Sequence, residues 1–250
     1  MNTIYLVVPC YNERDALPVT APVMLRKLRS LACSGKISRE SGLLFVDDGS
    51  DDGTWEVIRS LRQRDGLVSG VRLSLNRGHQ NALMAGLVTA MGWSDATISM
   101  DADLQDDINA IDEMAAKFAA GCPIVCGVRS RRDSDSFLKR ATARGYYGLM
   151  NLCGAGMIYD HADFRLLSRE AVRRLCRYGT EDLFIRGLIT RLDLPVEKVY
   201  YARAARTAGE SKYTLRKMLH LAMRGFSCGR MKPAGEMRVG ELYIAEVLHG

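Results

Sequence analysis

The first 120 residues alternate short, largely apolar runs with segments of helical periodicity, and this alternation constrains the fold more than any other feature. The apolar runs predict strands over residues 4–8, 43–46, 70–75 and 96–100. The intervening segments predict helices over residues 13–31, 54–64, 82–91 and 107–119, the first with a late or broken start because of Pro18 and Pro22. Strands that alternate with helices predict βαβ units and a mostly parallel, doubly wound α/β sheet.

Beyond residue 120 the pattern is less regular. It predicts a fifth strand over residues 124–128, helices over 137–152 and 169–178, and a last strand over 196–203. Asn12 is predicted to cap the first helix, and Ser168 is predicted to cap the helix over 169–178. The charged stretch over 129–136 is expected to form a loop, and the stretch over 160–167 receives no assignment.

Length and composition fit one α/β domain with an appendage, because 250 residues are too few for two large independent domains. The N-terminus shows no basic segment followed by a long apolar one, so we expect no secretory signal and a cytoplasmic protein. The seven cysteines are scattered without a Cys-x-x-Cys pair, and the four histidines are dispersed. This pattern favours reduced thiols and argues against disulfides and a zinc site.

The basic residues concentrate near the C-terminus. Nine basic and two acidic residues lie between Arg203 and Arg238, a local charge of +7, so the rest of the chain is near −1 within the net charge of +6. From residue 214, apolar and basic side chains separate onto two helical faces, which suits a membrane interface or packing against the domain equally well. We therefore predict a domain over 1–213 and a basic amphipathic helix and tail over 214–250. An anionic membrane surface fits this segment, whereas nucleic acid does not, because aromatic residues are not interleaved on a basic face. No apolar run is long enough for a spanning helix.

Four polar clusters follow the first four predicted strands, at Pro9–Glu13, Asp47–Asp51, Asn76–Gln80 and Asp101–Gln105. In a doubly wound sheet the ligand crevice lies beyond the carboxyl ends of the strands, so these clusters should converge. Asp101 and Asp103 would point to the same side of an extended chain. With the Gln105 amide they can hold Mg²⁺ or Mn²⁺, which then binds phosphate oxygens. The alternative is that these acids are helix caps and solvated loop charges.

Six blocks of the sequence, in order, resemble the family 2 glycosyltransferases with a GT-A fold. Within that family they are similar to the polyprenyl-phosphate glycosyltransferases, of the dolichyl-phosphate mannose synthase and bacterial polyisoprenyl-phosphate glucosyltransferase type. The blocks are Val8–Glu13, Val46–Thr54, Asn76–Gln80, Asp101–Gln105, Asp163–Leu166 and Gly209–Tyr213. The resemblance implies a Rossmann-like, mostly parallel sheet flanked by helices, here followed by the amphipathic segment.

The resemblance also implies roles for individual residues. Asp101 and Asp103, helped by Gln105, would bind the metal, and Ala102 lies between them in the donor site. Arg129 and Arg132, with Arg206 and Lys212, would meet the donor and acceptor phosphates. The residues implied to hold the base and ribose of a nucleotide sugar are Pro9, Tyr11, Asn12, Glu13 and Asp48.

The implied reaction is an inverting displacement that moves a hexose, UDP-glucose being the favoured donor, to a polyprenyl phosphate at the cytoplasmic membrane face. Asp103, Asp163 and Arg165 would be catalytic. Asp163 would position the acceptor or the sugar, or act as a base if the acceptor is a hydroxyl, and the alternative for Asp163 and Arg165 is a local ion pair. A GDP-mannose-dependent enzyme and a non-catalytic nucleotide-sugar-binding relative remain open. Relatives of the glucosyltransferase type continue into two spanning helices, so a truncated or soluble variant, a membrane partner protein or a homo-oligomer are further alternatives.

Overall fold

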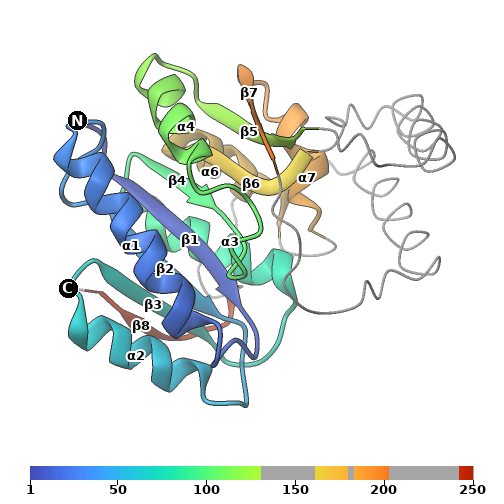
Figure 1. Cartoon of the computed structure of the whole chain (residues 1–250). Coiled ribbons are helices and arrows are strands. Elements are labelled where there is room, and N and C mark those ends of the chain that lie inside the picture. The colour runs from blue at the N-terminus through green and yellow to red at the C-terminus, as the bar shows by residue number, and fades with distance from the viewer. Residues whose placement is uncertain (131–160, 180–182, 203–241, 250) are drawn as a thin grey trace, which may run out of the picture.

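The computed structural model describes residues 1–130, 161–179, 183–202 and 242–249 (Figure 1). In this part of the chain one mixed sheet has the strand order β7-β5-β6-β4-β1-β2-β3-β8. The strands are β1 (Ile4–Cys10), β2 (Gly42–Asp47), β3 (Val68–Leu73), β4 (Ala96–Ser99), β5 (Ile124–Arg129), β6 (His161–Ser168), β7 (Val196–Tyr201) and β8 (Ile244–Leu248). Only β6 and β8 run against the common direction among these described strands.

Helices cover both faces of the sheet, and alternate residues of the central strands supply both cores. Leu6 and Val8 of β1 pack into the core beneath α1 (Leu17–Cys33), α2 (Thr54–Arg64) and α4 (Ala110–Ala119). Tyr5 and Val7 pack into the opposite core, beneath α3 (His79–Met91), α6 (Arg169–Leu175) and α7 (Ile185–Leu188). Figure 1 shows α1 and α2 in front of the sheet and α3 and α6 behind it. Two 3₁₀ turns follow α6 and α7, over Cys176–Tyr178 and Ile189–Arg191.

The predicted α/β architecture is confirmed, and most predicted elements differ from the structure only at their ends. Helix α1 begins late, at Leu17, with Pro18 in its first turn, as the prolines predict. The cap predicted at Asn12 is wrong, because Asn12 is left-handed (φ 55°) and Ala16 occupies the N-cap. The Asn12 side chain instead accepts a hydrogen bond from the Asp51 N–H at 3.2 Å. The cap at Ser168 is confirmed, since its Oγ accepts from the Ala171 N–H at 3.1 Å.

Strand β6 was not predicted, and it is central to the sheet. It lies antiparallel between β4 and β5, with Arg165 opposite both Ser99 and Cys126. Its sequence contains two acidic or basic residues, Asp163 and Arg165, and a charged residue in a strand buried on both faces contradicts the apolar pattern of such strands. The strand therefore gave no clear signal in the sequence.

Strand β8 comes from the predicted tail and pairs antiparallel with β3, so these last described residues belong to the sheet and not to an appendage. Glu246 accepts a hydrogen bond from Trp55 Nε1 at 3.1 Å and pairs with Arg59, both on α2. His249 stacks on Trp93 with 3.6 Å between ring centroids. The boundary predicted at residue 213, the basic helix and the helix over 137–152 lie outside the described residues.

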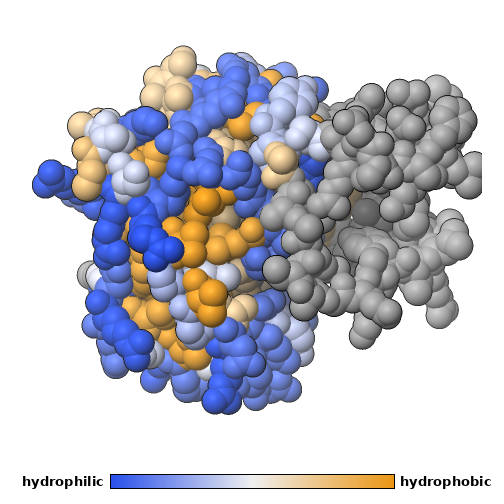
Figure 2. All heavy atoms as spheres, viewed as in Figure 1, coloured by the Kyte–Doolittle hydropathy of each residue, from blue (hydrophilic) through white to orange (hydrophobic). Residues whose placement is uncertain are grey.

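The outer surface is mostly hydrophilic on the face shown in Figure 2, with a hydrophobic strip over α1 and α2. Between these two helices runs a groove of about 540 Å³, lined in part by Leu25, Val57 and Leu61. It is separate from the pocket at the strand ends described below. No helix in the described ranges is long and apolar enough to cross a membrane.

We predict that Gly86→Ala destabilises the protein by about 1–3 kcal/mol, because the added methyl would overpack the interface between α3 and the sheet. A Cβ at Gly86 would lie 2.5 Å from side-chain atoms of Val7 and Val46. The midpoint of urea unfolding should fall without a change in slope. Gly92→Ala is the matched control, because Gly92 is already helical and its nearest neighbour would be 3.4 Å away. Equal stability of the two variants would contradict this close packing of α3.

Candidate active site

A pocket of about 390 Å³ lies where β1, β2 and β4 end and α3 begins. It contains residues from all four polar clusters that follow the predicted strands. Of the residues implied to bind a nucleotide sugar, the pocket is lined by Pro9, Tyr11, Glu13, Asp48, Asp101, Ala102 and Asp103. The structure thus brings these residues together, and their binding roles stay predictions.

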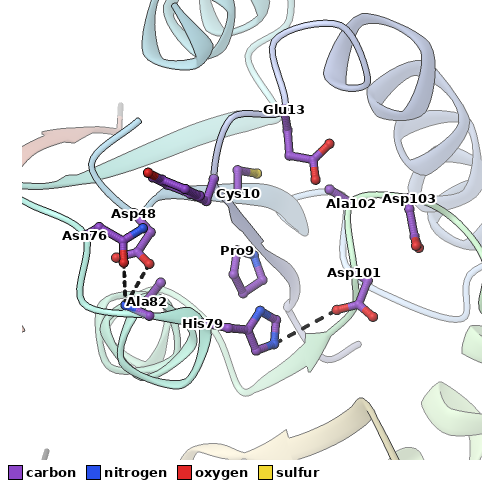
Figure 3. Close-up of a pocket in the computed structure, with 12 residues that line it drawn as sticks. Pro9, Cys10, Glu13, Asp48, Asn76, His79, Ala82, Asp101, Ala102 and Asp103 are labelled. Atoms are coloured by element: carbon purple, nitrogen blue, oxygen red, sulfur yellow. Dashed lines mark hydrogen bonds and ion pairs between the residues drawn. The ribbon is translucent and has the colours of Figure 1, made fainter. Parts of the chain in front are cut away.

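Three carboxylates, those of Glu13, Asp101 and Asp103, surround Ala102 on one side of the pocket (Figure 3). Burial raises the pKa of Glu13, and the charges of Asp103, Asp52 and Asp101 raise it further. Burial also raises the pKa of Asp101, where Asp163, Asp106 and Asp103 add to the effect and His79 opposes it. Mutual repulsion of this kind marks a site that a cation would stabilise.

The donor set fits a divalent ion of the Mg²⁺ or Mn²⁺ kind, because these ions take carboxylate oxygens together with substrate phosphates. Among the described residues, no group of three or more His, Cys, Asp or Glu side chains is arranged as a ready metal site. Asp101 and Asp103 could therefore hold the ion together with oxygens of a bound diphosphate. Gln105 does not line this pocket. The left-handed backbone of Leu104 (φ 51°) turns the chain, and Gln105 lines a neighbouring hollow instead. The Gln105 backbone N–H donates a hydrogen bond to Asp103 Oδ1 at 3.1 Å.

Asp48 organises the opposite wall of the pocket. Its two oxygens accept hydrogen bonds from the backbone N–H groups of Arg77 at 2.7 Å and Gly78 at 2.8 Å. Burial raises its pKa, although these two hydrogen bonds oppose the change. On the outer side, the Arg77 guanidinium lies 3.6 Å from the ring centroid of Tyr243. The turn that starts α3 is therefore held between β2 and the C-terminal segment.

Asp163 is bound by several cationic groups at the start of β6. Arg165, two residues along the same strand, pairs with it from a fully buried position, and burial lowers the pKa of Arg165. Arg186 of α7 donates to Asp163 Oδ2 at 3.1 Å. His79 Nε2 lies 3.9 Å from Asp163 Oδ2 and 4.0 Å from Asp101 Oδ1, so it joins Asp163 to the pocket. The local ion pair that was the alternative for Asp163 and Arg165 is thus present.

Two of these residues were missed by the sequence reasoning. His79 lies within the Asn76–Gln80 block, which supports the resemblance, but received no role. Arg186 lies in a short helix beside Leu183 and Phe184, both buried, and nothing in the sequence marks it. Only its distance to Asp163 in space identifies it.

Arg129 is held away from the pocket by other partners. Its guanidinium pairs with buried Asp106 at 3.3 Å, and Asp106 also accepts a hydrogen bond from the Tyr201 hydroxyl at 2.7 Å. Burial opposes the charge on Arg129, but Asp106 and Tyr201 together outweigh burial, so the pKa of Arg129 is raised. Asn12 also does not line the pocket, and its N–H donates to Ser50 Oγ at 3.0 Å. Arg132, Arg206 and Lys212 lie outside the described residues.

Known proteins resemble this chain in sequence and in fold. The family model "Glycosyl transferase family 2" matches residues 5–176. An uncharacterized glycosyltransferase, YkoT of Bacillus subtilis, is 43% identical over 91% of this chain and 68% of its own length. The bactoprenol glucosyl transferase of Shigella phage SfV is 36% identical over 98% of this chain and 77% of its own length.

A solved structure of glucosyl-3-phosphoglycerate synthase from Mycobacterium tuberculosis, in complex with Mn²⁺, UDP-glucose and phosphoglyceric acid, has the same overall fold. The TM-score is 0.59 at 17% identity, covering 92% of this chain and 81% of the synthase. The similarity supports the predicted GT-A architecture of the sheet and its flanking helices.

We predict that Asp101→Asn raises the melting temperature of the metal-free protein, because the substitution removes the repulsion between Asp101 and its neighbouring acids. The rise should be only about 1–3 °C, because the Asp101 side chain is 37% exposed and water screens the repulsion. The pKa of Asp101 is raised in the fold, so its ionised form is less favourable there than in the unfolded chain. Wild-type stability should accordingly fall as pH rises from the ordinary pKa of an aspartate to the raised value, and the loss persists at neutral pH.

The matched control is Asp112→Asn. Lys27 and Lys36 lower the pKa of Asp112 despite some burial, so its charge is stabilising above the ordinary pKa and this variant should melt lower. Thermal unfolding followed by circular dichroism measures both. A lower melting temperature for Asp101→Asn would contradict the repulsion.

Proposed function

Because the chain belongs to glycosyl transferase family 2 and is a glycosyltransferase, we propose that it moves a hexose from a nucleotide sugar, UDP-glucose being favoured, to a polyprenyl phosphate. The observation that carries the proposal is the group of three carboxylates around Ala102 in a pocket at the strand ends. The choice of glucose and of a polyprenyl acceptor is supported by the bactoprenol glucosyl transferase that aligns with 98% of the chain.

The donor would lie across the pocket with its base beside Tyr11, which is 48% exposed and offers an aromatic face. Glu13 and Asp48 would accept hydrogen bonds from the base and ribose, and charged acceptors make such bonds strong. Each oxygen of Asp48 has a second acceptor position beyond the one used by the 77–78 backbone. Asp101 and Asp103 would hold Mg²⁺ or Mn²⁺, which when bound neutralises charge on the departing nucleoside diphosphate.

The reaction we propose is a single in-line displacement. An oxygen of the acceptor phosphate forms a bond to the anomeric carbon while the bond to the diphosphate oxygen breaks, so an α-linked donor gives a β-linked product. A phosphate monoester has a second pKa of about 6 and arrives ionised, so no general base is needed. This agrees with the contacts of Asp163, whose carboxylate is already bound by Arg165 and Arg186 and is suited to positioning.

The location we propose is the cytoplasmic face of a membrane, where a polyprenyl phosphate presents its head group. The basic segment over 214–238 would attract anionic lipids. A GDP-mannose donor, a partner membrane protein and a homo-oligomer stay alternatives within this proposal. A non-catalytic binding protein is disfavoured, because the acids of the pocket are all present.

The test is incubation of the purified chain with Mn²⁺, a polyprenyl phosphate and labelled UDP-glucose, GDP-mannose or UDP-N-acetylglucosamine. We expect label from UDP-glucose in the lipid fraction, and Asp103→Ala should lower the rate on the order of 100-fold or more while leaving the fold intact. Asp15→Ala is the control, because Asp15 is exposed and does not line the pocket. Transfer of no sugar with any donor would refute the proposal, and full activity of Asp103→Ala would refute the metal assignment.

A further inference from the structure

We propose that Arg186 binds the phosphate of the acceptor substrate. The inference rests on the proposed function and deepens it, since it assigns the acceptor head group to a residue that neither the motifs nor the pocket lining had indicated. Its basis is the set of contacts made by Arg186, Arg165 and Asp163.

Two arginines share one carboxylate at the start of β6, and they differ in exposure. The Arg165 side chain has no exposed surface, whereas that of Arg186 is 27% exposed. One arginine is enough to balance the charge of Asp163, and the buried one already does so. The second arginine therefore adds a positive charge at a partly exposed place.

The position of Arg186 is fixed relative to the pocket. Helix α7 begins at Ile185, whose backbone N–H donates to Gln80 Oε1 at 3.1 Å. Gln80 follows His79, which lines the pocket and lies 3.9 Å from Asp163. The start of α3 thus carries a pocket residue and the anchor of α7 side by side. Arg186 Nη2 and His79 Nε2 approach the same oxygen, Asp163 Oδ2, at 3.1 Å and 3.9 Å.

Arg186 also has hydrogen-bonding capacity to spare. A guanidinium carries five N–H donors. Arg186 donates from Nη2 to Asp163 Oδ2, which uses one of these donors, and the side chain is 27% exposed. A phosphate dianion accepts two N–H bonds from one guanidinium in a favourable fork geometry.

Electrostatics require such a group on this side of the pocket. An anionic acceptor that approaches a sugar beside Glu13, Asp101 and Asp103 is repelled by three carboxylates. A cation at the acceptor end offsets this repulsion, and Asp163 keeps that cation in place. Arg186 is then a substrate-binding residue, and Asp163 and Gln80 are its positioning residues.

The experiment uses the full chain with Arg186→Gln and Arg186→Lys. The KM for a polyprenyl phosphate at saturating UDP-glucose should rise at least tenfold in the glutamine variant, as expected for a lost charged hydrogen bond. The KM of the lysine variant should lie between those of the wild type and the glutamine variant, because lysine keeps the positive charge but lacks the paired N–H donors of a guanidinium. Calorimetric affinity for UDP with Mn²⁺ should change less than twofold in both. Arg26→Gln is the control, because Arg26 is exposed on α1, away from the pocket at the strand ends.

Binding of farnesyl phosphate in the presence of UDP and Mn²⁺, measured by calorimetry, separates the two proposals. If the wild-type chain binds it and Arg186→Gln does not, the inference holds even where no sugar is transferred and the proposed function fails. If wild type transfers sugar and Arg186→Gln keeps the wild-type acceptor KM, the inference is overturned. It is also overturned if the wild-type chain does not bind farnesyl phosphate, or if both variants lose UDP affinity and acceptor affinity together, which would indicate a structural role.

Discussion

The ion pair between Arg165 and Asp163 is the interaction on which the site depends. A fully buried guanidinium is costly unless an opposite charge and hydrogen bonds compensate it. Strand geometry supplies the partner, because residues two apart on a strand face the same side. The register of β6 against β4, with Arg165 opposite Ser99, then carries Asp163 past the end of β4, beside the Asp101 loop. A hydrogen bond of 2.6 Å from Ser99 Oγ to the Asp163 carbonyl oxygen fixes that position.

The result is a site divided by charge. Strands β1 and β4 deliver Glu13, Asp101 and Asp103 to one side, where they repel one another and fit a cation with a diphosphate. The antiparallel β6 and helix α7 deliver two arginines and one acid to the other side. His79 stands between the two sides, about 4 Å from an acid of each. A parallel strand in the place of β6 would have brought its carboxyl end to this edge, and Asp163 would lie at the far edge of the sheet.

The sequence predicted well which residues form the carboxylate side of this arrangement, and it predicted poorly the side formed by β6 and α7. Buried parallel strands are apolar and periodic, so their ends could be located, and the acids after β1, β2 and β4 were expected to converge. Strand β6 carries charges inside the sheet and gave no such signal. No sequence pattern encodes the hydrogen bonds that the Asp48 oxygens accept from the 77–78 backbone. The role of Asp48 in holding the base and ribose, which the resemblance implies, stays a prediction. Arg186 and Asp163 are 23 residues apart, and only the folded chain shows that they meet.

The C-terminal strand β8 connects the tail of the chain to the candidate active site. From its sequence, the segment from residue 214 was expected to be a basic amphipathic helix and tail, either at a membrane interface or packed against the domain. The structure shows that its last part completes the sheet at β3, and that Tyr243 supports Arg77 on the turn held by Asp48. That turn carries Gly78 and His79 into the pocket. A truncation at residue 213 would therefore remove a support of the pocket at the strand ends together with the basic segment. Loss of activity in such a variant cannot be assigned to lost membrane attachment, and the basic residues have to be replaced singly, with β8 left in place.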